Sequence, residues 1–274
     1  MSPFVVGPEA GVGHTHTVIL LHGRDSDARE FGNEFLECSA TTSTPTGKNS
    51  LPDLFPAVRW VFPQARHCQS QRFDTQMSQW FDMWTTENPQ ERSELQRPGL
   101  SWSVDHLRAL IREEEVRVPR ERIVLAGISQ GFAAVLATFL ADGKGGFAGL
   151  AGFCSWFPLV DQVTSPMTTP QVVPLHERLA AVQQLFLHDG GDGANTQPES
   201  LPASSQLTVT TTLIHLQHSR DDEVIAIENG ERMRDVLEQL GFGDVQWREY
   251  EDGGHWFNEP QGVDDFFEFL ERVW

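Results

Sequence analysis

The chain has 274 residues, and its 39 acidic side chains against 20 basic ones give a formal net charge of −19. This balance excludes a protein that binds nucleic acid or anionic lipid through charge, because no basic stripe is present to replace counterions. The length predicts one domain, residues 1–274, since α/β enzymes often reach about 250 residues as a single unit. Three widely spaced cysteines and an N-terminus without the pattern of a signal peptide favour a cytoplasmic protein with free thiols.

Short apolar runs alternate with longer amphipathic stretches along the chain. We expect strands at 17–22, 58–62, 123–126, 147–153, 212–216 and 245–250, and helices at 28–38, about 101–117, 131–141, 176–187, 225–240 and 262–273. Most of the strands are continuously apolar, which is typical of a parallel sheet covered on both faces. The alternation predicts an α/β fold with an open, mostly parallel central sheet flanked by helices.

Residues 123–141 form a run of 19 without a charge, which is long enough to cross a membrane. The run contains polar residues and two glycines, and its centre fits a tight turn. We therefore interpret it as a buried strand, a turn and a buried helix, and predict no stable membrane insertion.

Two stretches interrupt the alternation, the polar loop 41–53 and the longer insertion 160–207. Loops of more than about 12–15 residues are usually functional lids or mobile segments, and we predict one or the other for 160–207. Its segment 189–195, DGGDGAN, is acidic and rich in glycine, as calcium-binding loops are, but it lacks the ligand set of such a loop. The pair His14 and His16 likewise lacks further zinc ligands in a suitable spacing. We predict no metal and no cofactor.

The segment Gly127-Ile128-Ser129-Gln130-Gly131 fits the pattern G-x-S-x-G. The pattern alone is weak, but here it lies between a predicted strand and a predicted helix rich in small residues. A sharp turn at this place exposes a serine hydroxyl at the carboxyl edge of the sheet. Ser129 is therefore the candidate nucleophile.

A serine nucleophile needs a base and an orienting acid, which follow it in the chain order Ser, Asp or Glu, His. His255 follows the last predicted strand and two glycines, and is the candidate base. Asp221 and Asp222 both follow the strand 212–216, and spacing alone leaves either as the acid. The backbone N–H groups of Gln130 and Arg24 are the candidate oxyanion donors. We interpret His22 as a buried ring that shapes the turn before Arg24.

Six segments occur in the order seen in the phospholipase/carboxylesterase family. They are LLHGRDSDAREFGNEF from residue 20, FPQARHCQSQRFDTQMSQWFDMW from 62, RIVLAGISQGFAAVLA from 122, SWFPL from 155, HSRDDEV from 218 and GGHWF from 253. The chain resembles the acyl-protein thioesterase-like α/β hydrolases of this family, and in particular their fungal carboxylesterase-type members. The resemblance extends from about residue 17 to the C-terminus, except for 160–207.

The resemblance implies an α/β-hydrolase fold with Ser129 as nucleophile, His255 as base and Asp222, rather than Asp221, as acid. It also implies Arg24 and Gln130 as oxyanion donors. It places Trp80, Phe81 and Trp156 near the acyl pocket, with plain core packing as the alternative for all three.

Three departures from the family pattern bear on the substrate. Ser219 stands where glycine is usual, Glu223 where proline is frequent, and Arg24 where the thioesterases commonly have leucine. With the long insertion, they favour a carboxylesterase for small or medium acyl groups. The alternatives are a thioesterase or lysophospholipase that removes long acyl chains, and a binding protein without turnover. The expected partner is a small-molecule or acyl-protein ester, and a homodimer through the apolar segment 155–159 is left open.

Overall fold

The computed structural model describes residues 2–165, 173–187 and 208–274. Its centre is a seven-stranded sheet with the order β1-β3-β2-β6-β7-β8-β9. The strands are β1 (Phe4–Val6), β2 (His16–Leu21), β3 (Val58–Phe62), β6 (Ile123–Ile128), β7 (Gly149–Phe153), β8 (Ile214–Ser219) and β9 (Val245–Tyr250). Only β1 runs antiparallel to its neighbour within this sheet. The predicted mostly parallel sheet is confirmed.

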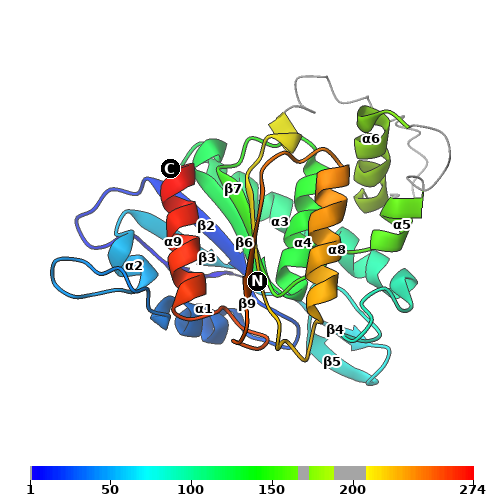
Figure 1. Cartoon of the computed structure of the whole chain (residues 1–274), viewed down its shortest axis with the longest axis horizontal. Coiled ribbons are helices and arrows are strands. Elements are labelled where there is room, and N and C mark those ends of the chain that lie inside the picture. The colour runs from blue at the N-terminus through cyan, green and yellow to red at the C-terminus, as the bar shows by residue number, and fades with distance from the viewer. Residues whose placement is uncertain (1, 166–172, 188–207) are drawn as a thin grey trace.

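Helices cover both faces of the sheet (Figure 1). On one face lie α1 (Ala28–Glu37) and α9 (Gln261–Val273), and on the other lie α3 (Gln96–Glu115), α4 (Gln130–Asp142) and α8 (Ile227–Gln239). The short α2 (Leu51–Leu54) lies beside α1, while α5 (Val160–Thr164) and α6 (Leu175–Phe186) pack at the outer side of α4 and α8. Two 3₁₀ turns, Ser93–Leu95 and Arg120–Arg122, precede α3 and β6. This arrangement is an α/β fold of three layers.

The uncharged run 123–141 forms β6, a turn and the start of α4, as the sequence predicts. Every residue of β6, β7 and β8 is buried, which explains why these strands are apolar without alternation. Helix α4 approaches the sheet so closely that a Cβ on Gly152 would lie 2.4 Å from the ring of Phe132. No helix within the described residues is long and apolar enough to cross a membrane.

Some elements differ from the prediction for local reasons. Strand β6 continues to Ile128 because Gly127 and Ile128 still pair with β7. Helix α3 begins at Gln96, since Pro98 lies in its first turn, where a missing N–H removes no helical hydrogen bond. Helix α8 begins only at Ile227, because the N–H of Ile225 donates to the carboxylate of Asp222.

Sequence reasoning missed β1, α2, α5 and the hairpin of β4 (His67–Ser70) with β5 (Thr75–Ser78). Within the insertion 160–207 the structure describes α5 and α6, and α6 matches the helix expected there. The remaining parts, 166–172 and 188–207, lie outside the described residues, as does the acidic segment 189–195. The prediction of a lid or mobile insertion therefore stays a prediction.

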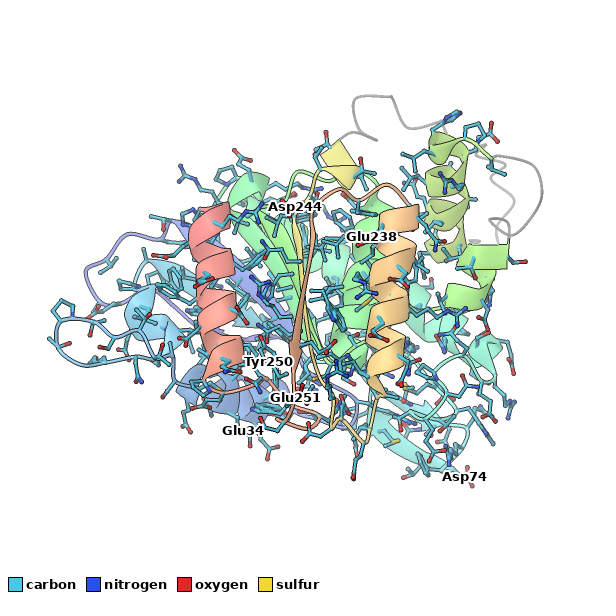
Figure 2. All side chains as sticks on the ribbon, viewed as in Figure 1. Glu34, Asp74, Glu238, Asp244, Tyr250 and Glu251 are labelled. Carbon is cyan, nitrogen blue, oxygen red and sulfur yellow. The ribbon has the colours of Figure 1, made fainter. Side chains whose placement is uncertain are left out.

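The carboxyl ends of the parallel strands lie at one end of the molecule. In Figure 2, Asp244, just before β9, lies at the upper end, and Tyr250, its last residue, lies at the lower end. Glu34 of α1 and Asp74 between β4 and β5 also lie at the lower end (Figure 2). The loops after β2, β6, β7, β8 and β9 therefore come together there, and they carry the predicted site residues.

Candidate active site

Ser129 lies between the last residue of β6 and the first residue of α4. Its backbone has φ 55° and ψ −126°, a strained conformation for a residue with a side chain. Two hydrogen bonds hold it: its N–H donates to the carbonyl of Phe153 at 2.8 Å, and its carbonyl accepts from the hydroxyl of Ser155 at 2.7 Å. The end of β7 thus secures the turn that presents Ser129.

The two glycines of the turn are required by close backbone contacts. A Cβ on Gly127 would lie 2.6 Å from the backbone nitrogen of Phe132, and one on Gly131 would lie 2.4 Å from the carbonyl oxygen of Leu21. Gly131 is therefore the point where α4 touches the end of β2. The G-x-S-x-G pattern has a steric origin in this chain, as the predicted strand–turn–helix context requires.

Asp222 follows β8 and is enclosed by donors. Its Oδ1 accepts from the N–H groups of Val224 and Ile225, both at 2.9 Å, and its side chain is completely buried. Its Oδ2 lies 2.8 Å from Nδ1 of His255 and 3.2 Å from Nε2 of His218. Burial by itself raises the pKa of this carboxyl, but the hydrogen bonds from the two histidines outweigh burial and hold the pKa well below its usual range.

His255 is presented by the loop between β9 and α9. The preceding glycines, Gly253 and Gly254, have φ of 125° and 61°, so the turn uses backbone conformations that other residues rarely adopt. Because Nδ1 of His255 donates to the ionised Asp222, the ring is held in the tautomer that leaves a lone pair on Nε2. That nitrogen is therefore available to accept a proton.

Two further side chains hold the His255 loop, and sequence reasoning missed both roles. Asp221 accepts from the N–H of Gly254 at 2.8 Å, so it supports the loop without touching the imidazole. The thiol of Cys154 lies 3.3 Å from the carbonyl of Trp256 and 3.8 Å from that of Gly254. Burial raises the pKa of this thiol, which keeps it protonated and able to donate. The position of Cys154 directly after β7, at the sheet edge that carries the site, was the feature of the sequence that could have indicated this role.

Cys154, Asp222 and His255 also form the one group of three metal-type ligands found in the described part of the chain. Their ligand atoms lie within 4.8 Å of one another. Two of the three already hydrogen-bond each other, since the imidazole donates to the carboxylate. The cluster is thus part of the arrangement around His255.

The turn after β2 lies against Ser129 on the opposite side. A Cβ on Gly23 would lie 3.6 Å from the Cβ of Ser129, so the backbone leading to Arg24 passes close to the nucleophile. His22 shapes this turn, because its Nδ1 donates to the carbonyl of Gly23 at 2.6 Å and its Nε2 accepts from the N–H of Ala65 at 3.1 Å. The interpretation of His22 as a buried structural ring agrees with these contacts.

Trp80 and Phe81 do not line the cavity at Ser129; both are fully buried behind it. The indole of Trp80 donates to the carbonyl of His22 at 2.9 Å. The side chain of Gln130 accepts from the N–H of Trp80 at 2.9 Å and donates to the carbonyl of Phe81 at 2.8 Å. Residues 80–81 therefore link the turn before Arg24 to the start of α4 through hydrogen bonds, and we call this link the Trp80 brace.

Trp156 is also in the core, where its ring meets that of Phe81 edge to face at 6.3 Å. Its neighbours Phe157 and Leu159 are equally buried. The structure shows core packing for Trp80, Phe81 and Trp156, which is the alternative given for them above. The segment 155–159 consequently offers no exposed apolar patch for a homodimer.

A cavity of about 270 Å³ is lined by both Ser129 and His255. Most of the described residues that line it come from the carboxyl ends of the parallel strands and the loops that follow them, with one from α1 and one from the segment after β5: Gly23, Arg24, Asp25, Ser26, Phe31, Thr86, Ile128, Ser129, Val224, His255 and Trp256. Its apolar wall and its few polar groups are typical of a small-molecule site. Arg24, Ser129 and His255 therefore line one cavity, Asp222 contacts His255 outside that lining, and Gln130 follows Ser129 at the start of α4.

The neutral buried histidines predict a pH-dependent stability. Burial lowers the pKa of His22 and of His215 to about 4, whereas a histidine in the unfolded chain titrates near its ordinary pKa of 6.5. Between these values the unfolded chain binds more protons, so their contribution to stability is complete above pH 6.5 and is lost as the pH falls towards 4. We expect the free energy of unfolding to fall by up to about 1.4 kcal/mol per pH unit for each histidine between pH 6.5 and 5.

Urea unfolding at pH 7.5, 6.5, 5.8 and 5.0 measures this slope. The variant His215→Gln removes one of these groups and should reduce the slope by up to about 1.4 kcal/mol per pH unit. A free energy of unfolding that stays constant over this range would contradict the assignment of both rings as neutral.

Comparison with known proteins identifies the relatives of this fold and site. The model of the phospholipase/carboxylesterase family matches residues 3–184. Acyl-protein thioesterase 1 of Yarrowia lipolytica is 30% identical over 269 residues, which cover 96% of this chain and 94% of that protein. Acyl-protein thioesterase 1 of Emericella nidulans is 25% identical over 279 residues, covering 99% and 95% of the two chains.

Solved structures agree at the level of the fold. The crystal structure of Zea mays acyl-protein thioesterase 2 superimposes with a TM-score of 0.66 at 20% identity, covering 99% of this chain and 98% of that chain. The family model spans the strand–turn–helix around Ser129, and the Yarrowia relative extends the similarity along almost the whole chain. The chain belongs to the phospholipase/carboxylesterase family.

Proposed function

We propose that Ser129, His255 and Asp222 are the catalytic triad of this carboxylic ester hydrolase. The observation that carries the proposal is the 2.8 Å contact between Nδ1 of His255 and the buried carboxylate of Asp222, in a loop that lines the same cavity as Ser129. Nε2 of His255 accepts the proton of the serine hydroxyl as its oxygen attacks the ester carbonyl. The alcohol or thiol leaves with that proton, and water activated by His255 then releases the acid from the acyl-enzyme.

The oxyanion that forms in this reaction needs donors placed before the chemistry starts. Gln130 is the first residue of α4, where a backbone N–H has no acceptor within the helix. Arg24 follows the turn that touches Ser129, and its N–H is the second donor. The Trp80 brace supports this assignment, since it fixes both donors relative to each other.

The cavity favours small or medium acyl groups. Pockets for drug-sized ligands measure about 300–1,000 Å³, so a cavity of about 270 Å³ is at the small end. A long acyl chain would extend beyond the described wall. The second candidate function is removal of long acyl chains from proteins, and the observation that favours it is the similarity to the acyl-protein thioesterases of Yarrowia lipolytica and Emericella nidulans.

Hydrolysis of p-nitrophenyl esters from acetyl to palmitoyl separates the two candidates, with Ser129→Ala as the blank. Each buried methylene adds about 0.8 kcal/mol of binding, and methylenes beyond the cavity add none. We expect kcat/KM to be largest between acetyl and hexanoyl and to be at least about tenfold lower for palmitoyl. A maximum at decanoyl or longer would favour the deacylase.

A binding protein without turnover is the alternative of a different class. It would give no hydrolysis above the blank with any ester. Labelling by a fluorophosphonate probe distinguishes a binding protein from an enzyme, because the probe reacts only with a serine activated by a base.

We infer a cytoplasmic location from the three free cysteines.

A further inference from the structure

Arg24 is the one arginine among the described residues that line the cavity at Ser129. Its Nε donates to Oε1 of Gln79 at 3.0 Å, and its Nη2 donates to Oγ of Ser70 at 3.1 Å. Both acceptors are neutral. No carboxylate of the described residues lies within 4.0 Å of this guanidinium, although it belongs to a chain with a net charge of −19.

Arg24 is partly buried, and an arginine in such surroundings is usually paired with a carboxylate. Burial and the nearby charge of Arg72 lower the pKa of Arg24, while the charges of Asp82 and Asp25 oppose that shift without forming an ion pair with it. Charged groups that are removed from water are usually paired, because an unpaired charge loses its hydration without compensation. The largely buried Arg59 and Arg120 follow this rule through Glu114 and Asp142.

The guanidinium also keeps donors for a ligand. An arginine side chain has five N–H groups in a planar fork that matches the two oxygens of a carboxylate. Gln79 and Ser70 take two of them, which leaves three, including both on Nη1. Those two acceptors, and the ring of Phe73 at 5.3 Å, hold the side chain in place so that little freedom is lost on binding an anion.

We propose that Arg24 makes the enzyme selective for esters that carry an anionic group, such as a carboxylate, close to the scissile bond. The proposal rests on the proposed function, because it adds a substrate class to the same site. Asp25 lies on the same cavity wall. Its charge opposes an anionic substrate, and this predicts that its removal strengthens the selectivity.

The anionic group belongs either to the acyl part or to the alcohol part of the ester, and two substrate pairs distinguish these sources. For the acyl part, monoethyl glutarate is compared with ethyl glutaramate, its neutral amide. For the alcohol part, the butyryl ester of 3-hydroxypropanoate is compared with that of 3-hydroxypropanamide. Hydrolysis is followed at constant pH 7.5, and the readout is the ratio of kcat/KM between the charged and neutral member of each pair.

A charge-assisted, bidentate contact corresponds to a ratio of about 10 to 100 in at least one pair for the wild-type enzyme. Arg24→Gln should bring that ratio to about 1, and Arg24→Lys should keep part of it because the charge remains. Asp25→Asn should raise it. The ratio cancels any general loss of activity that a change at Arg24 causes, since both members of a pair share the same chemistry.

Arg72 provides the matched control. Its guanidinium lies 5.5 Å from the ring of Phe73, about the same distance as that of Arg24, but Arg72 is exposed and does not line the cavity. Arg72→Gln removes the same charge from the same neighbourhood and should leave the ratio unchanged. If Arg72→Gln and Arg24→Gln lower the ratio equally, a general electrostatic field and not a contact with Arg24 is responsible, and the proposal is overturned.

The remaining outcomes are also decisive. A ratio near 1 in the wild-type enzyme, or one that survives in Arg24→Gln, overturns the proposal while leaving the esterase assignment intact. Absence of Ser129-dependent hydrolysis with every ester overturns both. Should Arg24→Gln fail to fold, inhibition of the wild-type enzyme decides: glutarate should inhibit hydrolysis of ethyl butyrate at least about tenfold more tightly than glutaramide, and equal inhibition counts against the proposal.

Discussion

Replacing Ser129 with alanine is expected to lower kcat/KM for every ester substrate by about 10⁴-fold or more. The change removes the only atom that attacks the carbonyl, while the turn, the oxyanion donors and the cavity remain. Residual hydrolysis would come from binding and oxyanion stabilisation alone. The measurement is the kcat/KM of the purified variant on the ester that the wild-type enzyme hydrolyses best.

The same variant also tests the turn itself. Alanine keeps a Cβ, so the backbone at φ 55° stays strained, and the hydrogen bonds from Ser129 N–H and to its carbonyl are made by the backbone. The free energy of unfolding should therefore change by no more than about 0.5 kcal/mol. Loss of activity together with loss of the fold would leave the role of the hydroxyl undecided, and Ser129→Cys would then provide a second variant of similar size. Activity within tenfold of wild type in a folded Ser129→Ala protein rules out this nucleophile.

The central sheet and the position of the site could be predicted because both depend on local patterns. Buried parallel strands must be apolar on both faces, and the strands after 123 and 147 have such sequences. The turn at Ser129 needs glycine at two positions, and both are visible in the sequence. The order of Ser129, Asp222 and His255 then follows from the strands that they terminate.

The elements that were missed have weaker patterns for physical reasons. The hairpin β4–β5 is mostly polar and packs outside the main sheet, so neither alternation nor an apolar run marks it. Strand β1 has three residues and pairs with β3 only at the sheet edge. Short elements of this kind are determined by tertiary contacts, which a local pattern does not contain.

The surroundings of the triad show the same limit at the level of side chains. Trp80 and Phe81 lie in a segment that resembles the family, yet their rings are buried in the core. Their backbone N–H and carbonyl groups instead hydrogen-bond the side chain of Gln130 and so position the start of α4. This role depends on groups some 50 residues apart in sequence. Cys154 is similar, since its thiol contacts carbonyls about 100 residues further along the chain. Only the folded chain brings these partners together.

Asp222→Asn is expected to lower kcat by about 10⁴-fold at neutral pH, the order of effect that the same substitution has in other serine triads. Oδ1 of the asparagine can still accept from Val224 and Ile225, so its amide nitrogen occupies the place of Oδ2. That nitrogen is a donor and faces Nδ1 of His255. The imidazole must then accept at Nδ1 and carry its proton on Nε2, where the lone pair for the serine proton is needed.

His218 makes this substitution more severe. Its Nε2 lies 2.8 Å from the carbonyl oxygen of Ile225, which can only accept, so Nε2 carries a proton. That proton faces the same Oδ2 of Asp222 at 3.2 Å. Asparagine would therefore place its amide donor against a second donor that cannot change its tautomer. Because the side chains at positions 218 and 222 are both buried, we also expect a loss of about 1–3 kcal/mol in the free energy of unfolding.

Asp221→Asn is the matched control, because it makes the same chemical change one residue earlier. Its carbonyl oxygen can still accept from the N–H of Gly254, and its side chain does not reach the imidazole. We expect kcat to fall by less than about tenfold, with an unchanged free energy of unfolding. Steady-state kinetics and urea unfolding of the two variants side by side check the assignment. The opposite order of effects would mean that Asp221 orients the base, and the 2.8 Å contact between His255 and Asp222 would then be unrelated to turnover.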